Sequence, residues 1–240
     1  MKLLIKLFFI LFLFTSNKII SQESAICIYK VYPTNDFEKS DSKNQELSNA
    51  FSMLNKALNI AKDFEYILKY NKDESIFNKK EDMISDVNSS SYYAIATALV
   101  GRGVFYNALD KNIAFHQIES MGKEFIIELP SQGEWQITKE TKTIDGFKVF
   151  KAISECSTCA NNSIQEVWFT PEISTEFGPL GLNGLPGLIL EVKKKGFILR
   201  LDDIQFKEIE IEKPSNGERI TYTEYHKLTD QARKNAKGSK

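Results

Sequence analysis

Residues 191–201 read EVKKKGFILRL, two short strand-like runs on either side of a Lys-Gly turn. Glycine suits the turn because it adopts backbone conformations that other residues avoid. The pattern predicts a β-hairpin. A hairpin joins antiparallel neighbours, whereas parallel strands need long crossovers, so this stretch favours an antiparallel sheet.

Similar apolar runs recur along the chain, separated by clusters of Gly, Pro, Asn, Asp or Ser. In residues 63–70, Phe64, Tyr66, Leu68 and Tyr70 share one face with the period of two of a half-buried strand. The other runs are residues 25–32, 113–119, 123–129, 146–153, 164–170, 187–194 and 196–206. We therefore predict a mainly β fold with antiparallel pairing.

Two segments carry helix signals. Residues 44–61 place an apolar stripe at helical spacing, formed by Leu47, Phe51, Leu54, Leu58 and Ala61. Near the other end, Thr221 and Glu224 have the spacing of a capping box, which predicts a helix through about Lys234. We expect one amphipathic helix near the N-terminus and one C-terminal helix beside the sheet.

The first residues predict export. Lys2 and Lys6 precede an unbroken apolar run over residues 7–14, which is too short to cross a bilayer and fits a secretory signal peptide. We expect cleavage near Ser21–Gln22, with an uncleaved anchor as the competing interpretation. The prediction is a signal peptide over residues 1–21 and a single β-rich domain over residues 22–240.

Charge and composition argue against several classes of protein. The chain has 31 basic and 32 acidic residues. Removal of the signal peptide takes away Lys2, Lys6 and Lys18, so the mature protein carries a net charge near −4. Nucleic-acid binders show a basic face, so we expect no nucleic-acid partner. Past the signal no apolar stretch is long enough to span a membrane, and an aromatic content of 12% favours a folded core.

Residues 178–189 read GPLGLNGLPGLI, with Gly178, Gly181, Gly184 and Gly187 at a period of three. Four triplets cannot wind collagen, and a phosphate loop needs a following helix and an early lysine. A structural turn that folds back on the core through its leucines is the favoured interpretation. A loop that binds a ligand or partner, or inserts into a membrane surface, stays open.

The same segment carries a family resemblance. GLPGLILEV, preceded by WFTPEISTEFGPLGLN, resembles the signature of the GLPGLI family of exported Gram-negative envelope proteins. YILKYNKDESIF, EWQITKETKTIDGFKVFKA and IEKPSNGERITYTEYHKL resemble its other segments, so the likeness spans roughly Tyr29 to Leu228. The chain departs from the pattern at Ser174, and at Val149 or Phe150 in place of a cysteine. The resemblance implies an exported envelope protein and no chemistry. With the signal peptide, we expect a location in the periplasm or at the outer-membrane periphery.

A second likeness concerns architecture alone. The succession of a Trp-led strand, a turn, a long hairpin and a Trp-containing strand is similar to lipoprotein carriers of the LolA/LolB half-barrel type. Those proteins curl an antiparallel sheet around a helix and hold an acyl chain, and the helix over residues 44–61 could fill such a half-barrel. This is an analogy of fold and not of function.

Three cysteines are present. Cys156 and Cys159 form a C-x-x-C at the expected tip of a hairpin, where a disulfide is the favoured state in an exported protein. A redox-active pair, a metal site and a reduced pair are the alternatives. Cys27 is left over, as a buried thiol or as a partner for one of the others.

Catalytic motifs are absent from the sequence, and we predict neither a catalytic residue, nor a metal ligand, nor a cofactor. His116 lies in an alternating strand and His226 in the polar last helix, where packing or surface roles are the usual ones. We interpret Trp135 and Trp168 as core aromatics or as the lining of an apolar cavity. Arg102 lies between two glycines and is interpreted as a turn or bulge residue.

We expect a non-enzymatic envelope protein that binds an apolar ligand, an extended peptide or an envelope partner, with the glycine–leucine loop at the edge of its site. The alternatives are an envelope hydrolase that uses carboxylates or His116, and an accessory module of an outer-membrane transporter or secretion machine. The candidate binding residues are Trp168, Gly178, Pro179, Gly184, Leu185, Pro186, Gly187, Leu188 and Ile189.

Overall fold

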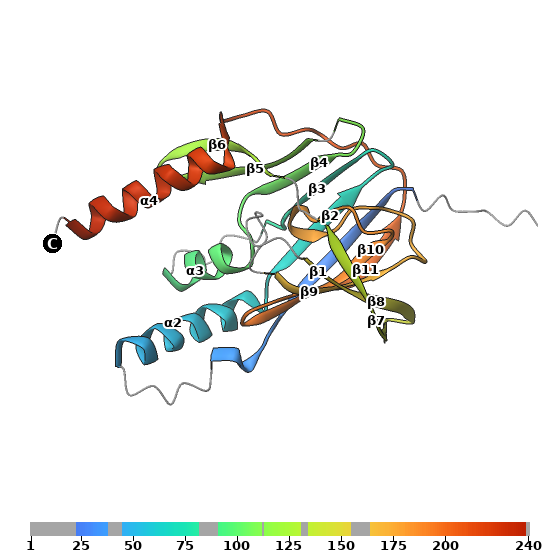
Figure 1. Ribbon diagram of the computed structural model, residues 1–240, viewed down its shortest axis with the longest axis horizontal. Coiled ribbons are helices and arrows are strands. Elements are labelled where there is room, and N and C mark those ends of the chain that lie inside the picture. Colours follow the sequence, from blue (N-terminus) through green and yellow to red (C-terminus); the bar gives the residue numbers. More distant parts are fainter. Residues whose placement is uncertain are drawn as a thin grey trace, which may run out of the picture.

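The computed structural model describes residues 23–37, 45–81, 91–111, 113–130, 134–154 and 164–238 (Figure 1). The expected signal peptide and the Cys156–Cys159 pair lie outside the described residues. The fold is mainly β: within the described part of the chain one open, mostly antiparallel sheet of twelve strands is accompanied by three α-helices.

The first half of the chain supplies the middle and one wing of the sheet. Its elements are β1 (Ala25–Pro33), η2 (Asn35–Phe37), α2 (Gln45–Ala61), β2 (Glu65–Tyr70), β3 (Glu74–Lys79), α3 (Ser91–Val100), β4 (Val104–Ala108), β5 (Ile113–Ser120) and β6 (Lys123–Glu128). As expected for a half-buried strand, β2 buries every second residue, namely Tyr66, Leu68 and Tyr70.

The second half adds the other wing and the last helix. Its elements are β7 (Trp135–Ile144), β8 (Phe147–Ser154), β9 (Ile164–Thr170), η4 (Pro179–Gly181), β10 (Leu188–Lys194), β11 (Phe197–Phe206), β12 (Glu218–Thr221) and α4 (Tyr222–Gly238). The hairpin predicted at residues 191–201 is β10–β11, with Glu191 opposite Arg200 and Lys194 opposite Phe197.

Strand β1 lies in the middle of the sheet, between β2 and β11. The order is β12-β6-β5-β4-β3-β2-β1-β11-β10-β9-β8-β7, so the two wings follow the chain as meanders and meet at β1. All described pairings are antiparallel except that of β12 with β6, which is parallel. This pair joins segments that are far apart in the sequence, and it places β12 at the edge of the sheet just before α4 begins.

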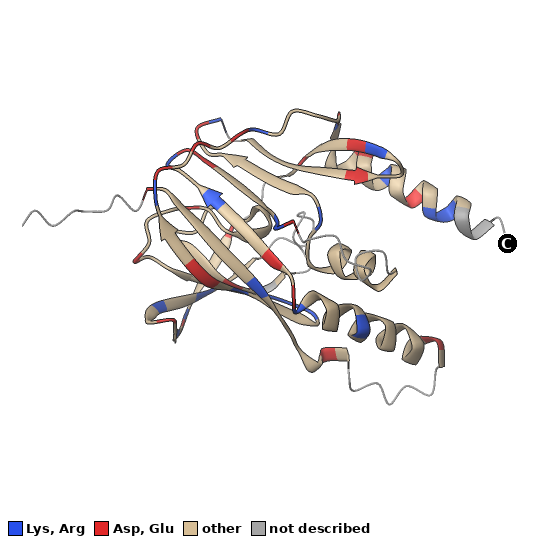
Figure 2. Ribbon diagram, turned by 180° about the vertical axis from the view of Figure 1, so that it is seen from behind, with Lys and Arg blue, Asp and Glu red and all other residues tan. Residues whose placement is uncertain are grey.

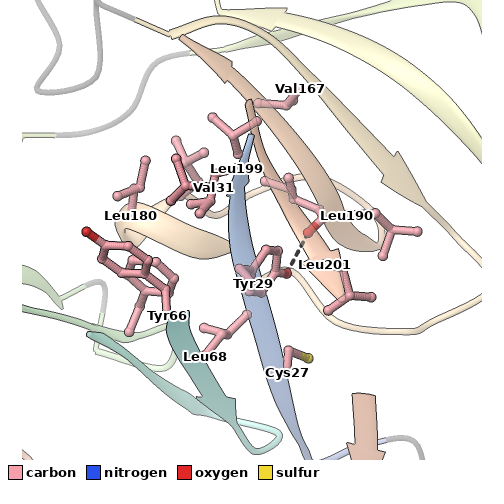
Figure 3. Packing of buried hydrophobic residues seen from close by; sticks show 14 of the residues in the cluster. Cys27, Tyr29, Val31, Tyr66, Leu68, Val167, Leu180, Leu190, Leu199 and Leu201 are labelled. Atoms are coloured by element: carbon pink, nitrogen blue, oxygen red, sulfur yellow. Dashed lines mark hydrogen bonds between the residues drawn. The ribbon is translucent and has the colours of Figure 1, made fainter. Parts of the chain in front are cut away.

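The main core lies on one face of the sheet. It is covered by α2, by α3 and by the segment of residues 171–187, and α2 and α3 pack side by side (Figure 1). The side chain of Tyr29 is fully buried in this core, and its hydroxyl donates to Ile189 O at 2.6 Å, two strands away (Figure 3). Burial raises the pKa of the Tyr29 hydroxyl, so it stays a neutral donor.

The wing that ends in β6 and β12 has its own packing on both faces. On one face Ile118, Phe125 and Ile127 pack against Tyr222 and Tyr225 from the first turns of α4. The opposite face buries Tyr106, Phe115 and Ile126. Beyond its first turns α4 projects away from the body (Figure 1).

Basic and acidic residues are interspersed over the strands, as Figure 2 shows from behind. Many of these charges pair across neighbouring strands, as Lys30 does with Asp202 at 2.8 Å. No helix in the described part of the chain is long and apolar enough to cross a membrane.

Candidate functional site

The glycine–leucine segment packs into the core. Leu180, Leu182, Leu185, Leu188 and Ile189 are each at most 3% exposed. Gly178 and Pro179 are buried, whereas Gly184 and Pro186 are exposed. The backbone closes on itself through Gly178 N–H, which donates to Leu182 O at 2.8 Å. Of the nine predicted binding residues, Gly184 and Pro186 are exposed and the others are buried, and the binding role stays a prediction.

Buried Asn107 of β4 fixes this segment to the sheet. Its Nδ2 donates to Gly181 O at 3.3 Å, and Asn183 Nδ2 donates to Asn107 Oδ1 at 3.1 Å. Trp135 Nε1 donates to Asn183 O at 2.9 Å from the other wing. The segment thus connects β4 with the start of β7, and its burial gives Leu180 a fixed place above β4 and β5.

Trp168, the remaining candidate from the sequence, lies on β9 and is 7% exposed. Its Nε1 donates to Glu166 Oε1 at 3.3 Å, and Lys142 Nζ lies 4.2 Å from the centroid of its ring. The indole is therefore covered by a cation and does not line an open apolar cavity. Cys27, the described cysteine, is buried, and burial raises the pKa of its thiol.

An open groove lies beside the last residues of β5, which extend past the start of the antiparallel strand β4. Strand β4 begins at Val104, opposite Gln117, so residues 118–120 of β5 have no β4 partner. The resulting hollow, here called the Arg102 groove, has a volume of about 550 Å³. It is lined by Arg102, Gly103, Val104, Gln117, Ile118, Glu119, Glu124 and Asn216.

Gly103 keeps this groove in shape. It has a φ of +78°, and a Cβ at this position would lie 2.2 Å from Gln117 O. Only glycine lets the backbone pass so close to β5 in this conformation. The close approach turns the chain from α3 into β4 and leaves the Arg102 side chain exposed at the groove.

A smaller hollow adjoins the groove at Arg102 and Ile118. This His116 cavity has a volume of about 210 Å³ and lies between the end of α3, the strands β4 and β5, Leu180 and the start of α4. Its walls are formed by Ala98, Val100, Gly101, Arg102, Phe105, His116, Ile118, Leu129, Leu180, Lys194 and Tyr222. The cavity thus combines aliphatic walls with four polar side chains.

His116 is held in one orientation. Its ring stacks on Phe105 with centroids 4.0 Å apart, and its Nε2 lies 2.6 Å from Arg102 O. A carbonyl oxygen only accepts, so Nε2 carries the proton and Nδ1 presents a lone pair. Burial lowers the pKa of His116 to about 4, so the ring is neutral at pH 7.

Lys194 brings a positive charge to the same cavity from the end of β10. Its Nζ lies 5.7 Å from the centroid of the Phe197 ring, and no carboxylate pairs with it among the described residues. Burial lowers the pKa of Lys194 because the ammonium is poorly hydrated there. An acceptor or an anion that enters the cavity would compensate the ammonium.

The groove and the cavity together present polar groups suited to a polar ligand. A guanidinium, two carboxylates and two amides line the groove and offer donors and acceptors in planar groups. No described histidine, cysteine or carboxylate belongs to a group of three that could hold a metal ion. Arg102, interpreted from the sequence as a turn residue, connects the two hollows.

The chain is similar to one protein-family model and to several solved structures. A family model described as the N-glycanase peptide, N-terminal domain (PNGase F-II N) matches residues 114–231, just under half of the chain. Two solved structures of PNGF-II are similar in fold, one in space group C2 (TM-score 0.51, 15% identity) and one in P21 (TM-score 0.52, 14% identity). No curated protein matches the chain significantly.

The match to PNGF-II extends over most of this chain but only part of the relative. The aligned regions cover 85% and 86% of this chain and 32% and 33% of the two PNGF-II chains. The chain thus spans about a third of the length of the solved proteins it resembles. At this level of identity the likeness concerns the fold alone.

These findings correct the expected family and function. The matching family model is that of the N-glycanase N-terminal domain, so the assignment to the GLPGLI family was wrong. The expected GLPGLI-type envelope binding protein, and the hydrolase kept as its alternative, fall with that assignment. The physical reason for the wrong assignment is that the glycine–leucine segment fills the core, with Leu185 at 1% and Leu188 at 0% exposure. Its unusual composition therefore reflects packing.

Proposed function

We propose that the chain is a non-catalytic recognition domain that binds N-linked glycans of glycoproteins in the Arg102 groove. The observation that carries the proposal is the match of residues 114–231 to the N-terminal domain of an N-glycanase, together with a fold similar to about a third of PNGF-II. The name of that relative concerns glycans attached to peptides, which makes such glycans the first ligand to test.

The groove supports this proposal by its size and lining. Its volume of about 550 Å³ falls within the range of roughly 300–1,000 Å³ of small-molecule sites. Sugars present neighbouring hydroxyls, each a donor and an acceptor, and planar polar groups can bond two of them at once. Arg102, Glu119 and Glu124 supply such groups.

The chain also offers a matched control surface. A second open groove, here called the Pro186 groove, has a volume of about 460 Å³. It is lined by Glu23, Asn71, Lys72, Leu109, Pro171, Ser174, Thr175, Glu176 and Pro186. In this groove Asn71 Oδ1 already accepts from Asp73 N–H and Glu74 N–H, so part of its polarity serves a turn.

The test is calorimetric titration of the purified chain with a peptide that carries an N-linked glycan and with the same peptide lacking the glycan. We expect binding of the glycosylated form only. Arg102→Met should weaken it about tenfold through loss of a charge-assisted hydrogen bond. Lys72→Met, in the Pro186 groove, should leave it unchanged. Equal binding of both peptides, or equal losses in both variants, would contradict the proposal.

The non-catalytic part of the proposal has its own measurement. Incubation with a glycoprotein should release no glycan, which a gel-mobility assay follows directly. Glycan release that survives purification of the chain to homogeneity would show that the domain is itself an enzyme. Export to the periplasm or the outer-membrane periphery stays a prediction, as do an outer-membrane or secretion-machinery partner and a lipid-like ligand.

A further inference from the structure

The His116 cavity has the size of a subsite. Its volume of about 210 Å³ lies below the range of roughly 300–1,000 Å³ that holds a whole small molecule. It meets the larger Arg102 groove at Arg102 and Ile118, which line both hollows. A ligand whose body lies in the groove can therefore place one end group in the cavity.

The charges of the two hollows differ. Glu119 and Glu124 line the groove, whereas no aspartate or glutamate is among the described residues that line the cavity. The cavity instead receives Lys194, and Arg102 lies at its junction with the groove. The Lys194 side chain is half-buried and no carboxylate pairs with it among the described residues, so an anionic end group gains from entering the cavity.

The neutral groups in the cavity narrow the chemical class of the end group further. His116 Nδ1 can accept one hydrogen bond, because Nε2–H already donates to Arg102 O. The hydroxyl of Tyr222 can donate or accept one more. The cavity thus offers a cation for an anion and an acceptor for a hydroxyl or amide N–H. Arg102 is exposed and stays hydrated at the junction with the groove, so the enclosed charge is that of Lys194 alone, which matches a singly charged carboxylate better than a doubly charged phosphate.

We infer that the His116 cavity binds an acidic sugar, a ring that carries a carboxylate beside its hydroxyls, as the end group of a glycan held in the Arg102 groove. This inference rests on the proposed glycan binding and adds its specificity. Lys194 pairs with the carboxylate, and His116 Nδ1 accepts from a neighbouring hydroxyl or amide. The side chains of Ala98 and Leu129, which keep exposed surface in the cavity wall, contact the apolar face of the ring.

The adjacent lysines of β10 provide a matched pair of variants. Lys194 lines the cavity, whereas Lys193 faces the other side of the sheet, with its Nζ 3.9 Å from Glu166 Oε1. Lys194→Met removes the cation and keeps an aliphatic side chain of similar length. Because the half-buried Lys194 ammonium has no carboxylate partner among the described residues, we expect this variant to fold as well as the wild type, which a thermal melt checks.

The first experiment compares two glycopeptides that differ only in their terminal sugar, one neutral and one carrying a carboxylate. We expect the wild type to bind the acidic form at least about tenfold more tightly, as one charge-assisted contact allows. Lys194→Met should abolish this preference, and Lys193→Met should keep it. Equal affinities in the wild type would overturn the acidic subsite and leave the glycan-binding proposal standing. Failure to bind either form would overturn both.

A second experiment tests the cavity with free sugars and needs no variant. Glucuronate and glucose differ by the carboxylate that replaces a hydroxymethyl group. In amide NMR spectra of the wild type, glucuronate at millimolar concentration should shift Gly101 and Leu180, whereas glucose should not. Shifts of equal size with both sugars, or no shift with glucuronate, would overturn the inference. Shifts confined to the Pro186 groove would do the same.

Discussion

Lys142 of β7 and Glu191 of β10 meet at 2.6 Å between Nζ and Oε1, although β8 and β9 lie between their strands. In a flat sheet three strand spacings amount to about 14 Å. The side chains of Lys142 and Glu191 bridge this distance together, and the Lys142 ammonium lies over the Trp168 ring on β9. Arg200 reaches Glu191 from the other side, with 2.8 Å between Nε and Oε2. One buried carboxylate thus connects the edge hairpin with the middle of the sheet.

Glu191→Gln should destabilise the protein measurably. Glu191 is 2% exposed, and both cations would lose their partner. Because Lys142 and Arg200 keep about a third of their surface in water, we expect a loss of about 1–2 kcal/mol in the free energy of unfolding, less than for a fully buried pair. Urea unfolding measures it, with Asp202→Asn in the exposed pair with Lys30 as the control. A loss no larger than in that control would contradict a bridging role.

Gly187→Ala should be among the most damaging single substitutions. The φ of Gly187 is +152°, and a Cβ there would lie 2.0 Å from Thr170 O, a backbone atom that cannot move aside. We expect a loss of about 3 kcal/mol or more, measured by thermal or urea unfolding. Gly122→Ala is the control, because its φ is +73° and its Cβ would meet nothing within 4 Å. For Gly122→Ala we expect the free energy of unfolding to fall by about 1 kcal/mol, the cost of the backbone conformation alone. Similar losses at both positions would show that the clash at Gly187 relaxes.

Thr221→Ala should loosen the start of α4. The predicted capping box is present: Thr221 N–H donates to Glu224 Oε2 at 2.9 Å, and Glu224 N–H donates to Thr221 Oγ1 at 3.3 Å. The Thr221 hydroxyl also donates to Glu224 Oε2 at 2.7 Å, and this bond, together with the one from Thr221 N–H, lowers the pKa of Glu224. We expect faster hydrogen exchange at the amides of the first turn of α4, which carries Tyr222 to the His116 cavity. Thr229→Ala, in mid-helix, should leave these amides unchanged; equal acceleration in both variants would rule out a capping effect.

The sequence predicts those elements whose signal is local. The period of two in β2, the apolar stripe of α2, the β10–β11 turn and the capping box each lie within a short window. Helix α3 escaped prediction because Ser91–Val100 is apolar on every side and shows no stripe. The parallel pairing of β12 with β6, and the place of β1 in the middle of the sheet, depend on contacts far apart along the chain.

The candidate site was beyond prediction for the same reason. The cavity combines Ala98, His116, Leu180, Lys194 and Tyr222 from five separate segments, and no spacing in the sequence relates them. His116 was interpreted as a packing or surface residue, and its stacking on Phe105 fits that view. The glycine–leucine stretch attracted attention because its composition is unusual. Its burial now explains that composition by packing.

The pH dependence of stability tests the environment of His116. Burial lowers its pKa to about 4 in the folded protein, against about 6.5 in an unfolded chain. Above pH 6.5 the ring is neutral in both states, so the folded state carries no penalty. Between pH 6.5 and 4 only the unfolded chain takes up the proton, and stability therefore falls as the pH falls. At pH 5 this difference in proton uptake lowers the free energy of unfolding by about 2 kcal/mol relative to its value above pH 6.5.

The measurement is urea unfolding at pH 7.5 and pH 5 for the wild type and His116→Gln. Glutamine keeps a donor for Arg102 O but has no proton to gain, so the variant should lose less stability than the wild type between the two pH values. Other titrating groups contribute equally to both proteins and cancel in the difference. His226→Gln, exposed on α4, should retain the wild-type dependence. If His116→Gln also retains it, His116 is hydrated in solution, and the cavity is more open than its walls indicate.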